Sequence, residues 1–355
     1  MTQARIAIVG GGLAGLYAAY RLHRLGVDFD LFEARSRLGG RILATGSAGF
    51  DLGPSWFWPD FQPRMQNLVT ELGLPVFEQY SAGAAVLEDR SIGVVRRPGY
   101  LSANPSMRVA GGTAQLVATL SGLLPPAHLH LNASLTAVTL EGTAVQLQFA
   151  DSADRSQTYT HLWLALPPRL IAGIAFRPSL PEQDVGPLMA VPTWMAAHAK
   201  YVAHYTNPFW REAGLSGDAF SRIGPLVEIH DAGNNKGAAL FGFFGINAAQ
   251  RAGLSASEIK AACRAQLQRL FGVEAANPVE DFFYDWAADT CTATEQDRLS
   301  GGEHAALDAG FVLSAPWTDR VRLVGSEAAV EQGGYMEGAL AAVDRALSMM
   351  EEILG

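Results

Sequence analysis

Three glycines near the start of the chain constrain its fold more than any other feature of the sequence. Gly10, Gly12 and Gly15 fit the pattern G-x-G-x-x-G within "RIAIVGGGLAGLYAAYRLHRLGVDFDLFE". The apolar run before them predicts a buried strand, and the apolar spacing after them predicts a helix. A second apolar run follows Gly26 and ends at Glu33. This order of strand, glycine turn, helix and strand predicts a Rossmann-type dinucleotide-binding unit.

Each glycine in this turn has its own physical role. Gly10 permits the tight turn, Gly12 lets the backbone approach a pyrophosphate at the helix N-terminus, and Gly15 allows the helix to pack closely on the strand. Glu33 is expected to accept hydrogen bonds from ribose hydroxyls, which disfavours a 2'-phosphate, although the nearby Arg35 keeps a phosphate contact open. A glycine turn that binds no nucleotide is the alternative interpretation.

The rest of the chain predicts separate helices and strands, without an internal repeat or a low-complexity tract. Residues 64–72 carry apolar side chains at helical spacing. The stretch "SLTAVTLEGTAVQLQF" alternates apolar and polar residues around a Glu-Gly pair, which predicts a hairpin. In "SASEIKAACRAQLQRLFG", Ser255 and Glu258 have capping-box spacing and Gly272 follows, which predicts a helix. A last helix is expected at residues 336–354.

The pattern of apolar and polar residues changes at about residue 191. The stretches "TWMAAHAKYVAHY", "PLVEIHD" and "AALFGFF" alternate apolar and polar residues, which predicts an antiparallel sheet. We therefore expect an α/β fold with two interleaved domains. The larger is a Rossmann-type dinucleotide-binding domain of residues 1–75, 108–190 and 286–355. The smaller is an α+β substrate domain of residues 76–107 and 191–285 that carries the antiparallel sheet.

Composition argues against several classes of protein. The 26 basic and 35 acidic residues give a formal charge of −9, which argues against a nucleic-acid partner. Cys263 and Cys291 provide neither a disulfide framework nor a zinc motif, so we expect no structural metal and a reducing compartment. The sequence shows no basic-then-apolar leader and no apolar run of membrane-spanning length. We therefore expect a cytoplasmic protein with no membrane partner.

Further motifs lie at both ends of the chain. The stretches "ARSRLGGRI" and "FDLGPSW" follow Glu33, and "GSEAAVEQGGYMEGALAAVDRA" precedes the C-terminus. With these motifs the sequence resembles the flavin-containing amine oxidase family, the monoamine and polyamine oxidase group. The resemblance is strong at both ends and looser in the middle. It implies an FAD-binding Rossmann-type domain, a small-molecule amine as substrate, and O2 or another compound as electron acceptor.

The resemblance also implies which residues bind FAD. Glu327 is expected to bond cofactor hydroxyls, and the backbone at Met336 is expected to face the flavin pyrimidine ring. A helix N-terminus presents free N–H groups and partial positive charge, which would stabilise negative charge on a reduced flavin. A glycine loop before an ordinary surface helix is the alternative for this segment. The expected cofactor contacts are Gly10, Gly12, Leu13, Ala14, Gly15, Glu33, Ala34, Arg35, Gly39, Gly40, Arg41, Gly53, Pro54, Ser55, Trp56, Val138, Glu327, Gly334, Tyr335 and Met336.

Two residues match catalytic positions of the family. Tyr335 matches the tyrosine that stands beside the flavin and flanks the substrate amine, which an electron-rich ring can hold. Lys200 matches the lysine that holds a water molecule against flavin N5, and we expect it on one strand face together with Trp194 and His198. A core tyrosine and a lysine on an exposed edge strand are the alternatives.

The aromatic partner of Tyr335 departs from the family pattern. The family places an aromatic residue after a Ser-Gly-Gly motif, whereas "LSGGEHAAL" has His304 there. Trp286 resembles an upstream tryptophan of the family, and Trp56 occupies the position of another aromatic residue of the family's pocket. We therefore expect His304 or Trp286, with Trp56, to complete the substrate cage. A solvent-facing His304 and a core Trp56 are the alternatives. Glu303 replaces the cysteine that binds flavin covalently in monoamine oxidases, so we expect FAD to be held non-covalently.

The resemblance implies a reaction class. A hydride would pass from the carbon next to a neutral amine to flavin N5, giving an imine that water hydrolyses. If Lys200 is buried, its charged form should be disfavoured, which suits a role in activating water. A carbon-carbon desaturase, a renalase-like oxidase of a dihydronicotinamide and a non-catalytic flavin-binding module remain the alternatives.

Overall fold

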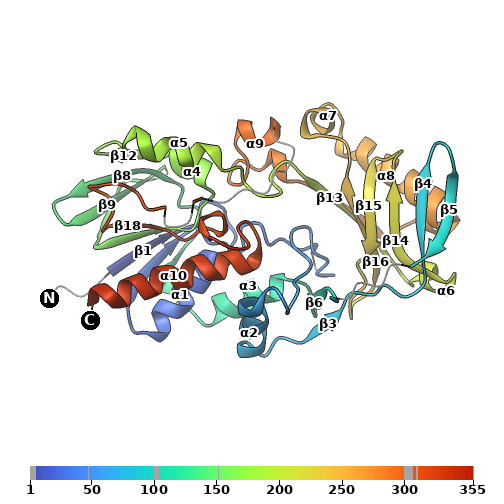
Figure 1. Cartoon of the computed structure of the whole chain (residues 1–355), viewed down its shortest axis with the longest axis horizontal. Coiled ribbons are helices and arrows are strands. Elements are labelled where there is room, and N and C mark those ends of the chain that lie inside the picture. Colours follow the sequence, from blue (N-terminus) through green and yellow to red (C-terminus); the bar gives the residue numbers. More distant parts are fainter. Residues whose placement is uncertain are drawn as a thin grey trace.

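In the computed structural model, a five-stranded parallel sheet lies at one end of the molecule (Figure 1). The glycine turn joins the first strand of the chain, which belongs to this sheet, to the first helix. The structure describes residues 5–46, 48–99, 104–150, 152–299, 307–308 and 311–354. Every strand pair in this sheet is parallel, as the expected Rossmann-type fold requires. In spatial order the strands are β18 (Val321–Leu323), β11 (His161–Leu164), β1 (Arg5–Val9), β2 (Asp28–Phe32) and β7 (Leu129–His130).

Both faces of the parallel sheet are buried, because its strands alternate between two apolar clusters. In β1, Ile6 and Ile8 pack into one cluster, whereas Ala7 and Val9 pack into the other. The first cluster includes side chains of the helices that lie along one side of the sheet in Figure 1. These helices are α1 (Leu13–Arg24), α3 (Ala114–Gly122) and α10 (Met336–Leu354), and α2 (Pro63–Glu71) packs on α10.

A four-stranded sheet and two short helices cover the other face. The expected hairpin is present as β8 and β9, which pair antiparallel. The strands are β10 (Ser152–Tyr159), β9 (Ala144–Phe149), β8 (Leu135–Glu141) and β12 (Ala175–Arg177), and the helices are α4 (Pro168–Ala172) and α5 (Glu182–Ala190). With the helices on the opposite side, this layer buries both faces of the parallel sheet.

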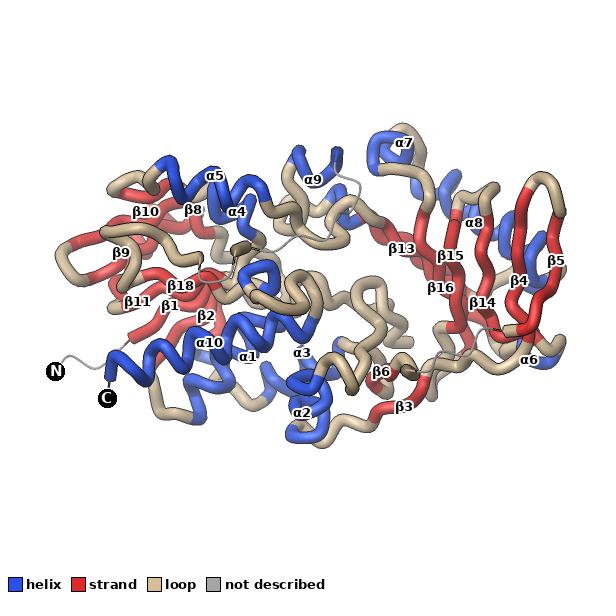
Figure 2. Tube along the Cα trace, in the orientation of Figure 1, coloured by secondary structure: helices blue, strands red, loops and turns tan. Residues whose placement is uncertain are grey.

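A seven-stranded sheet occupies the opposite end of the molecule (Figure 2). Its pairs are antiparallel, except that β14 and β4 run parallel. In spatial order the strands are β17 (Glu280–Asp285), β13 (Ala199–Tyr205), β16 (Ala238–Phe244), β15 (Leu226–Asp231), β14 (Leu215–Ser221), β4 (Ala84–Asp89) and β5 (Gly93–Pro98). The sheet therefore draws on two separate stretches of the chain, residues 84–98 and 199–285, and this arrangement is the basis of our proposal of interleaved domains.

The side-chain alternation of β13 decides which residues of this sheet face the centre of the molecule. Tyr201 and Ala203 pack with apolar residues of α8 (Ala256–Phe271), the helix that begins with the expected capping box. Val202 packs on the other face, with Phe241. Lys200, two residues before Val202, shares that face. Helix α8 thus covers one face, and the other face is turned toward the parallel sheet.

Shorter elements connect these layers. They are the two-stranded sheet of β3 (Val76–Glu78) and β6 (Met107–Val109), and the helices α6 (Phe209–Glu212), α7 (Ala248–Ala252) and α9 (Glu295–Leu299). In the described ranges, none of the helices combines the length and apolar character needed to cross a membrane.

One strand expectation is wrong at its beginning. The alternating stretch from Thr193 predicted a continuous strand, but β13 starts only at Ala199. Carboxylates from distant segments bind the preceding backbone: Thr193 N donates to Asp297, and Trp194 N donates to Glu327. These contacts replace strand pairing, so residues 193–198 form a loop.

Candidate active site

The glycine turn brings the backbone of β1 and α1 into close contact. A Cβ atom at Gly10 would collide with the carbonyl oxygen of Ala165, and one at Gly15 would collide with the carbonyl oxygen of Gly10. Gly10 also has a positive φ of 108°, which side chains rarely tolerate. The turn therefore needs glycine at both positions. It leaves Gly12 at the N-terminus of α1, next to open space.

Glu33 lies beside this turn and is almost fully buried. Its carboxylate accepts hydrogen bonds from Gly11 N at 2.7 Å and from Arg35 N at 2.9 Å. The Arg35 side chain extends to Asp289 at 2.7 Å and to Thr292 at 3.0 Å. A carboxylate and a guanidinium are thus held next to the end of the glycine turn.

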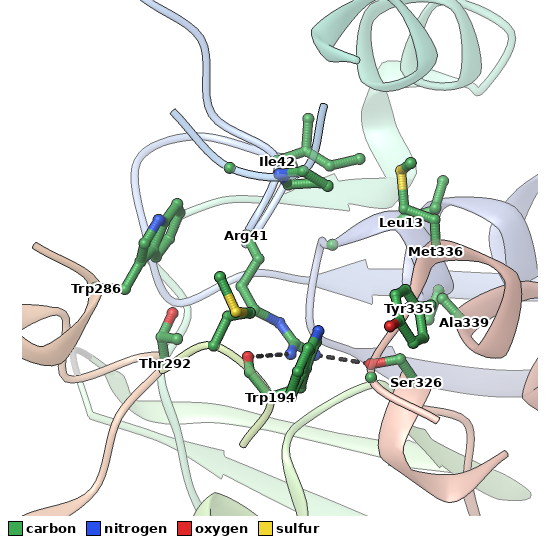
Figure 3. A pocket seen from close by; sticks show the side chains of 18 of the residues that line it. Leu13, Arg41, Ile42, Trp194, Trp286, Thr292, Ser326, Tyr335, Met336 and Ala339 are labelled. Atoms are coloured by element: carbon green, nitrogen blue, oxygen red, sulfur yellow. Dashed lines mark hydrogen bonds between the residues drawn. The ribbon is translucent and has the colours of Figure 1, made fainter. Parts of the chain in front are cut away.

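Arg41 and the fully buried Glu327 form a bidentate pair that joins the two ends of the chain. The Arg41 nitrogens donate to the two Glu327 oxygens at 2.6 and 2.9 Å, and to Ser326 Oγ at 2.8 Å. Arg41 also donates to the carbonyl oxygen of Trp194 at 3.2 Å (Figure 3). Burial alone would raise the pKa of Glu327, but the Arg41 charge and the hydrogen bonds outweigh burial and lower this pKa. Glu327 is therefore an anion that fixes the position of Arg41.

Lys200 is buried in the wall formed by β13. Its Nζ donates to Ser55 Oγ at 2.7 Å and to the carbonyl oxygen of Gly53 at 3.0 Å. It also lies 4.0 Å from the ring centroid of Phe241. Burial lowers the pKa of Lys200 to about 7, and the negative charge of Asp51 only partly opposes this effect. Near neutral pH, Lys200 can therefore exist in either its charged or its neutral form.

The segments described above meet at one cavity of about 350 Å³, within the range of small-molecule sites. The N-terminal glycine turn and the start of α10 both line it, although more than 300 residues separate them. Of the residues expected to contact cofactor or substrate, those that line the cavity are Gly10, Gly12, Leu13, Ala14, Glu33, Arg35, Gly39, Gly40, Arg41, Gly53, Pro54, Ser55, Trp56, Lys200, Trp286, Gly334, Tyr335 and Met336.

Four of the expected cofactor contacts, Gly15, Ala34, Val138 and Glu327, do not line this cavity. Val138 is fully buried in the apolar cluster under the parallel sheet, because it faces inward from β8. Glu327 lies behind Arg41, which uses both of its carboxylate oxygens. The positions of His304 and Glu303 lie outside the described residues.

The structure adds cavity residues to which the sequence assigned no role. They include Trp58, Gln62, Trp194, Met195, His198, Phe243, Cys291, Thr292 and Ser326. Trp58 had a detectable signal, because "SWFWPD" spaces two tryptophans at a period of two, which places both on one side of an extended segment. Trp194 was expected on the strand face of Lys200, but it reaches the cavity from the loop that precedes β13.

The chemistry of the cavity fits a flavin dinucleotide. The glycine turn offers backbone N–H groups for a pyrophosphate, and Glu33 offers an acceptor for ribose hydroxyls. At the opposite end of the chain, α10 begins at Met336 in the cavity wall. Its first N–H groups and partial positive charge suit an electron-rich ring edge. The residues present therefore match FAD in both its nucleotide part and its flavin part.

Comparisons with known protein families agree with this chemistry. The family model described as flavin containing amine oxidoreductase matches residues 93–346, and the model of an NAD(P)-binding Rossmann-like domain matches residues 8–72. A probable flavin-containing monoamine oxidase A of Dictyostelium discoideum is 23% identical, covering 94% of each chain. The flavin-containing amine oxidase B of Homo sapiens is 23% identical, covering 99% of this chain and 86% of the human protein.

Solved structures share the fold over nearly the full length of the chain. A structure of putrescine oxidase bound to putrescine matches with a TM-score of 0.80 at 22% identity, covering 98% of this chain and 99% of the other. The cyclohexylamine oxidase from Brevibacterium oxydans matches with a TM-score of 0.81 at 19% identity, covering 99% of each chain.

Proposed function

Because this chain belongs to the flavin containing amine oxidoreductase family, and is therefore an oxidoreductase with FAD as its cofactor, we propose that it oxidises a small-molecule amine to an imine. The observation that carries this proposal is a single cavity lined by the glycine turn, the start of α10, Lys200 and Tyr335. When bound, FAD supplies the acceptor for the hydride that leaves the carbon next to the amine nitrogen. Water then hydrolyses the imine.

The nucleotide end of the cavity would hold the adenosine and pyrophosphate parts of FAD. The backbone at Gly12 and the first turn of α1 would bind the pyrophosphate. Glu33 would accept hydrogen bonds from the ribose hydroxyls, and Arg35 would contact a neighbouring phosphate. Arg41, held by its buried partner Glu327, keeps a permanent positive charge in the wall.

The start of α10 would support the flavin ring. The first N–H groups of a helix lack partners within the helix and carry partial positive charge. Met336 opens this helix in the cavity wall, directly after Tyr335. With FAD bound, these N–H groups would stabilise negative charge on the reduced flavin ring.

Lys200 and Tyr335 would act on the substrate side. With a pKa of about 7, Lys200 can hold a water molecule and accept a proton from it near neutral pH. Tyr335 presents an aromatic face that can hold the amine nitrogen. Both side chains line the cavity, so both can reach a bound amine.

The proposal is tested by anaerobic reduction of the bound flavin. We expect a panel of primary and secondary amines to bleach the yellow flavin absorbance, whereas NADH and polyenes leave it unchanged. Bleaching by NADH would favour the dihydronicotinamide oxidase, and bleaching by a polyene would favour the desaturase. A flavin that none of these compounds reduces would overturn the proposal in favour of a non-catalytic binding module.

A further inference from the structure

Two tryptophans outside the family motifs contact Tyr335 in the cavity wall. The ring centroids of Trp58 and Tyr335 are 6.4 Å apart, with the ring planes at 88°. Those of Trp194 and Tyr335 are 5.9 Å apart, with the planes at 44°. Both distances lie in the range where aromatic pairs attract each other. Since all three side chains line the cavity, they form a continuous aromatic wall, which we call the Tyr335 wall.

The polar edge of Trp58 is turned away from the cavity. Its Nε1 donates to Ser106 Oγ at 2.9 Å, and the neighbouring Trp56 donates in the same way to Gln79 Oε1 at 2.8 Å. Neither Ser106 nor Gln79 is among the described residues that line the cavity. The two indoles therefore offer carbon surface to a ligand, because their N–H groups already have partners in the protein.

Trp194 is held in place before any ligand arrives. Its backbone N donates to Glu327, and its carbonyl oxygen accepts from Arg41, as Figure 3 shows for the Arg41 contact. Its side chain packs on Gly334, where an added Cβ would lie 2.5 Å from the Trp194 Cβ. Gly334 also has a φ of 81°, so a side chain there would be strained as well. The second glycine of "QGGYM" therefore makes room for Trp194.

We propose that Trp58 and Trp194 are specificity-determining residues, and that the Tyr335 wall selects amines that carry a flat aromatic group. This inference rests on the proposed amine oxidation. A preformed wall of carbon surface gains contact with a flat apolar ring without having to be ordered on binding. A short aliphatic amine covers less of the wall and leaves part of it in contact with water.

The selectivity can be measured as binding, without turnover. Cumylamine and tert-butylamine each lack a hydrogen on the carbon next to nitrogen, so neither can lose a hydride, but only cumylamine carries a phenyl ring. Their dissociation constants with the FAD-loaded protein follow from perturbation of the flavin absorbance. We expect the wild type to bind cumylamine at least about 30-fold more tightly than tert-butylamine.

The variants Trp58→Ala and Trp194→Ala should each reduce the ratio of the two dissociation constants by at least about fivefold. The variants Trp58→Phe and Trp194→Phe should retain most of this ratio. Phe61→Ala is the matched control, because Phe61 is an exposed aromatic residue near Trp58 that does not line the cavity. Flavin content and circular dichroism report whether each variant is folded.

The inference is overturned if the wild type binds both amines equally or binds neither, or if both alanine variants keep the wild-type ratio. Failure of the proposed function has a different signature. In that case cumylamine still binds selectively, but amines that carry the transferable hydrogen do not reduce the flavin.

Discussion

At the scale of single residues, two cations in the cavity wall have opposite electrostatic surroundings. Arg41 forms an ion pair with the fully buried carboxylate of Glu327. Lys200 bonds only to the neutral oxygens of Gly53 and Ser55, and within the described ranges no carboxylate forms an ion pair with it. A buried cation without a paired anion loses its proton more easily. Arg41 therefore suits binding, and Lys200 suits proton transfer.

The titration of Lys200 predicts the pH dependence of turnover. Because its pKa is about 7, Lys200 is protonated below this pH and neutral above it. A step that needs the neutral side chain of Lys200 should accelerate as the pH rises through about 7, which gives the pH profile of turnover a rising limb. We expect Lys200→Met to remove this limb from the pH profile and to slow turnover, while the protein retains its FAD. If the limb persists in the variant, another group is responsible for it.

At the scale of elements, residues 286–297, which follow β17 and extend into α9, form a strap that is anchored at two points beside the cavity. Asp289 binds Arg35 at the nucleotide end, in a pair whose side chains are both largely buried. Asp297 binds Arg169 of α4, again in a buried pair. Cys291 and Thr292, between these anchors, line the cavity. We infer that this strap closes the nucleotide end of the cavity.

This strap predicts a variant with weaker cofactor binding. Asp289→Asn should release the Arg35 side chain, because a neutral amide cannot replace the charged pair. We expect FAD to dissociate about tenfold more readily, measured by the fluorescence of released flavin. Glu295→Gln is the matched control, since Glu295 is an exposed acid of the same segment. Equal retention of FAD by both variants would contradict the role of the strap.

At the scale of the whole molecule, the cavity is lined from both major sheets, so a bound cofactor would bridge them. Lys200 and Phe243 come from the seven-stranded sheet, whereas Gly10 and Gly12 follow the first strand of the parallel sheet. Among the residues that the structure describes, one thiol lines the cavity, that of Cys291. Burial raises the pKa of this thiol, which lies beside the nucleotide-end residues Arg35 and Glu33. We therefore maintain the prediction that FAD is held without a covalent bond.

Non-covalent FAD should leave the protein on acid precipitation. FAD that is added back to the FAD-free protein should stabilise the folded state. We expect a yellow supernatant and a colourless pellet after acid treatment. A ligand that binds only the folded state at 100 times its dissociation constant adds about 2.7 kcal/mol to the free energy of unfolding. Denaturant titrations at increasing FAD should show this gain. FMN, which lacks adenosine, should give a smaller gain. A coloured pellet, or stability independent of FAD, would contradict the prediction.

Much of the fold and part of the site could be predicted from short stretches of sequence. The glycine turn after β1, the capping box of α8 and the hairpin of β8 and β9 all occur as expected. Each depends on interactions between residues a few positions apart, which local spacing encodes. The place of Tyr335 beside the cofactor was predicted from the C-terminal motif, and that of Lys200 from its match to the family's lysine in the middle of the chain.

The sequence by itself determined that a dinucleotide fold and two glycine-bearing segments are present, because turns, caps and strand alternation are set by neighbouring residues. Only the tertiary structure decided that Trp58 and Trp194 contact Tyr335 and that Glu327 lies behind Arg41. These contacts join positions far apart in the chain, across loops whose paths depend on which distant carboxylates bind their backbone N–H groups. Local patterns contain no information about such partners, so the selectivity of the cavity emerges only when the chain has folded.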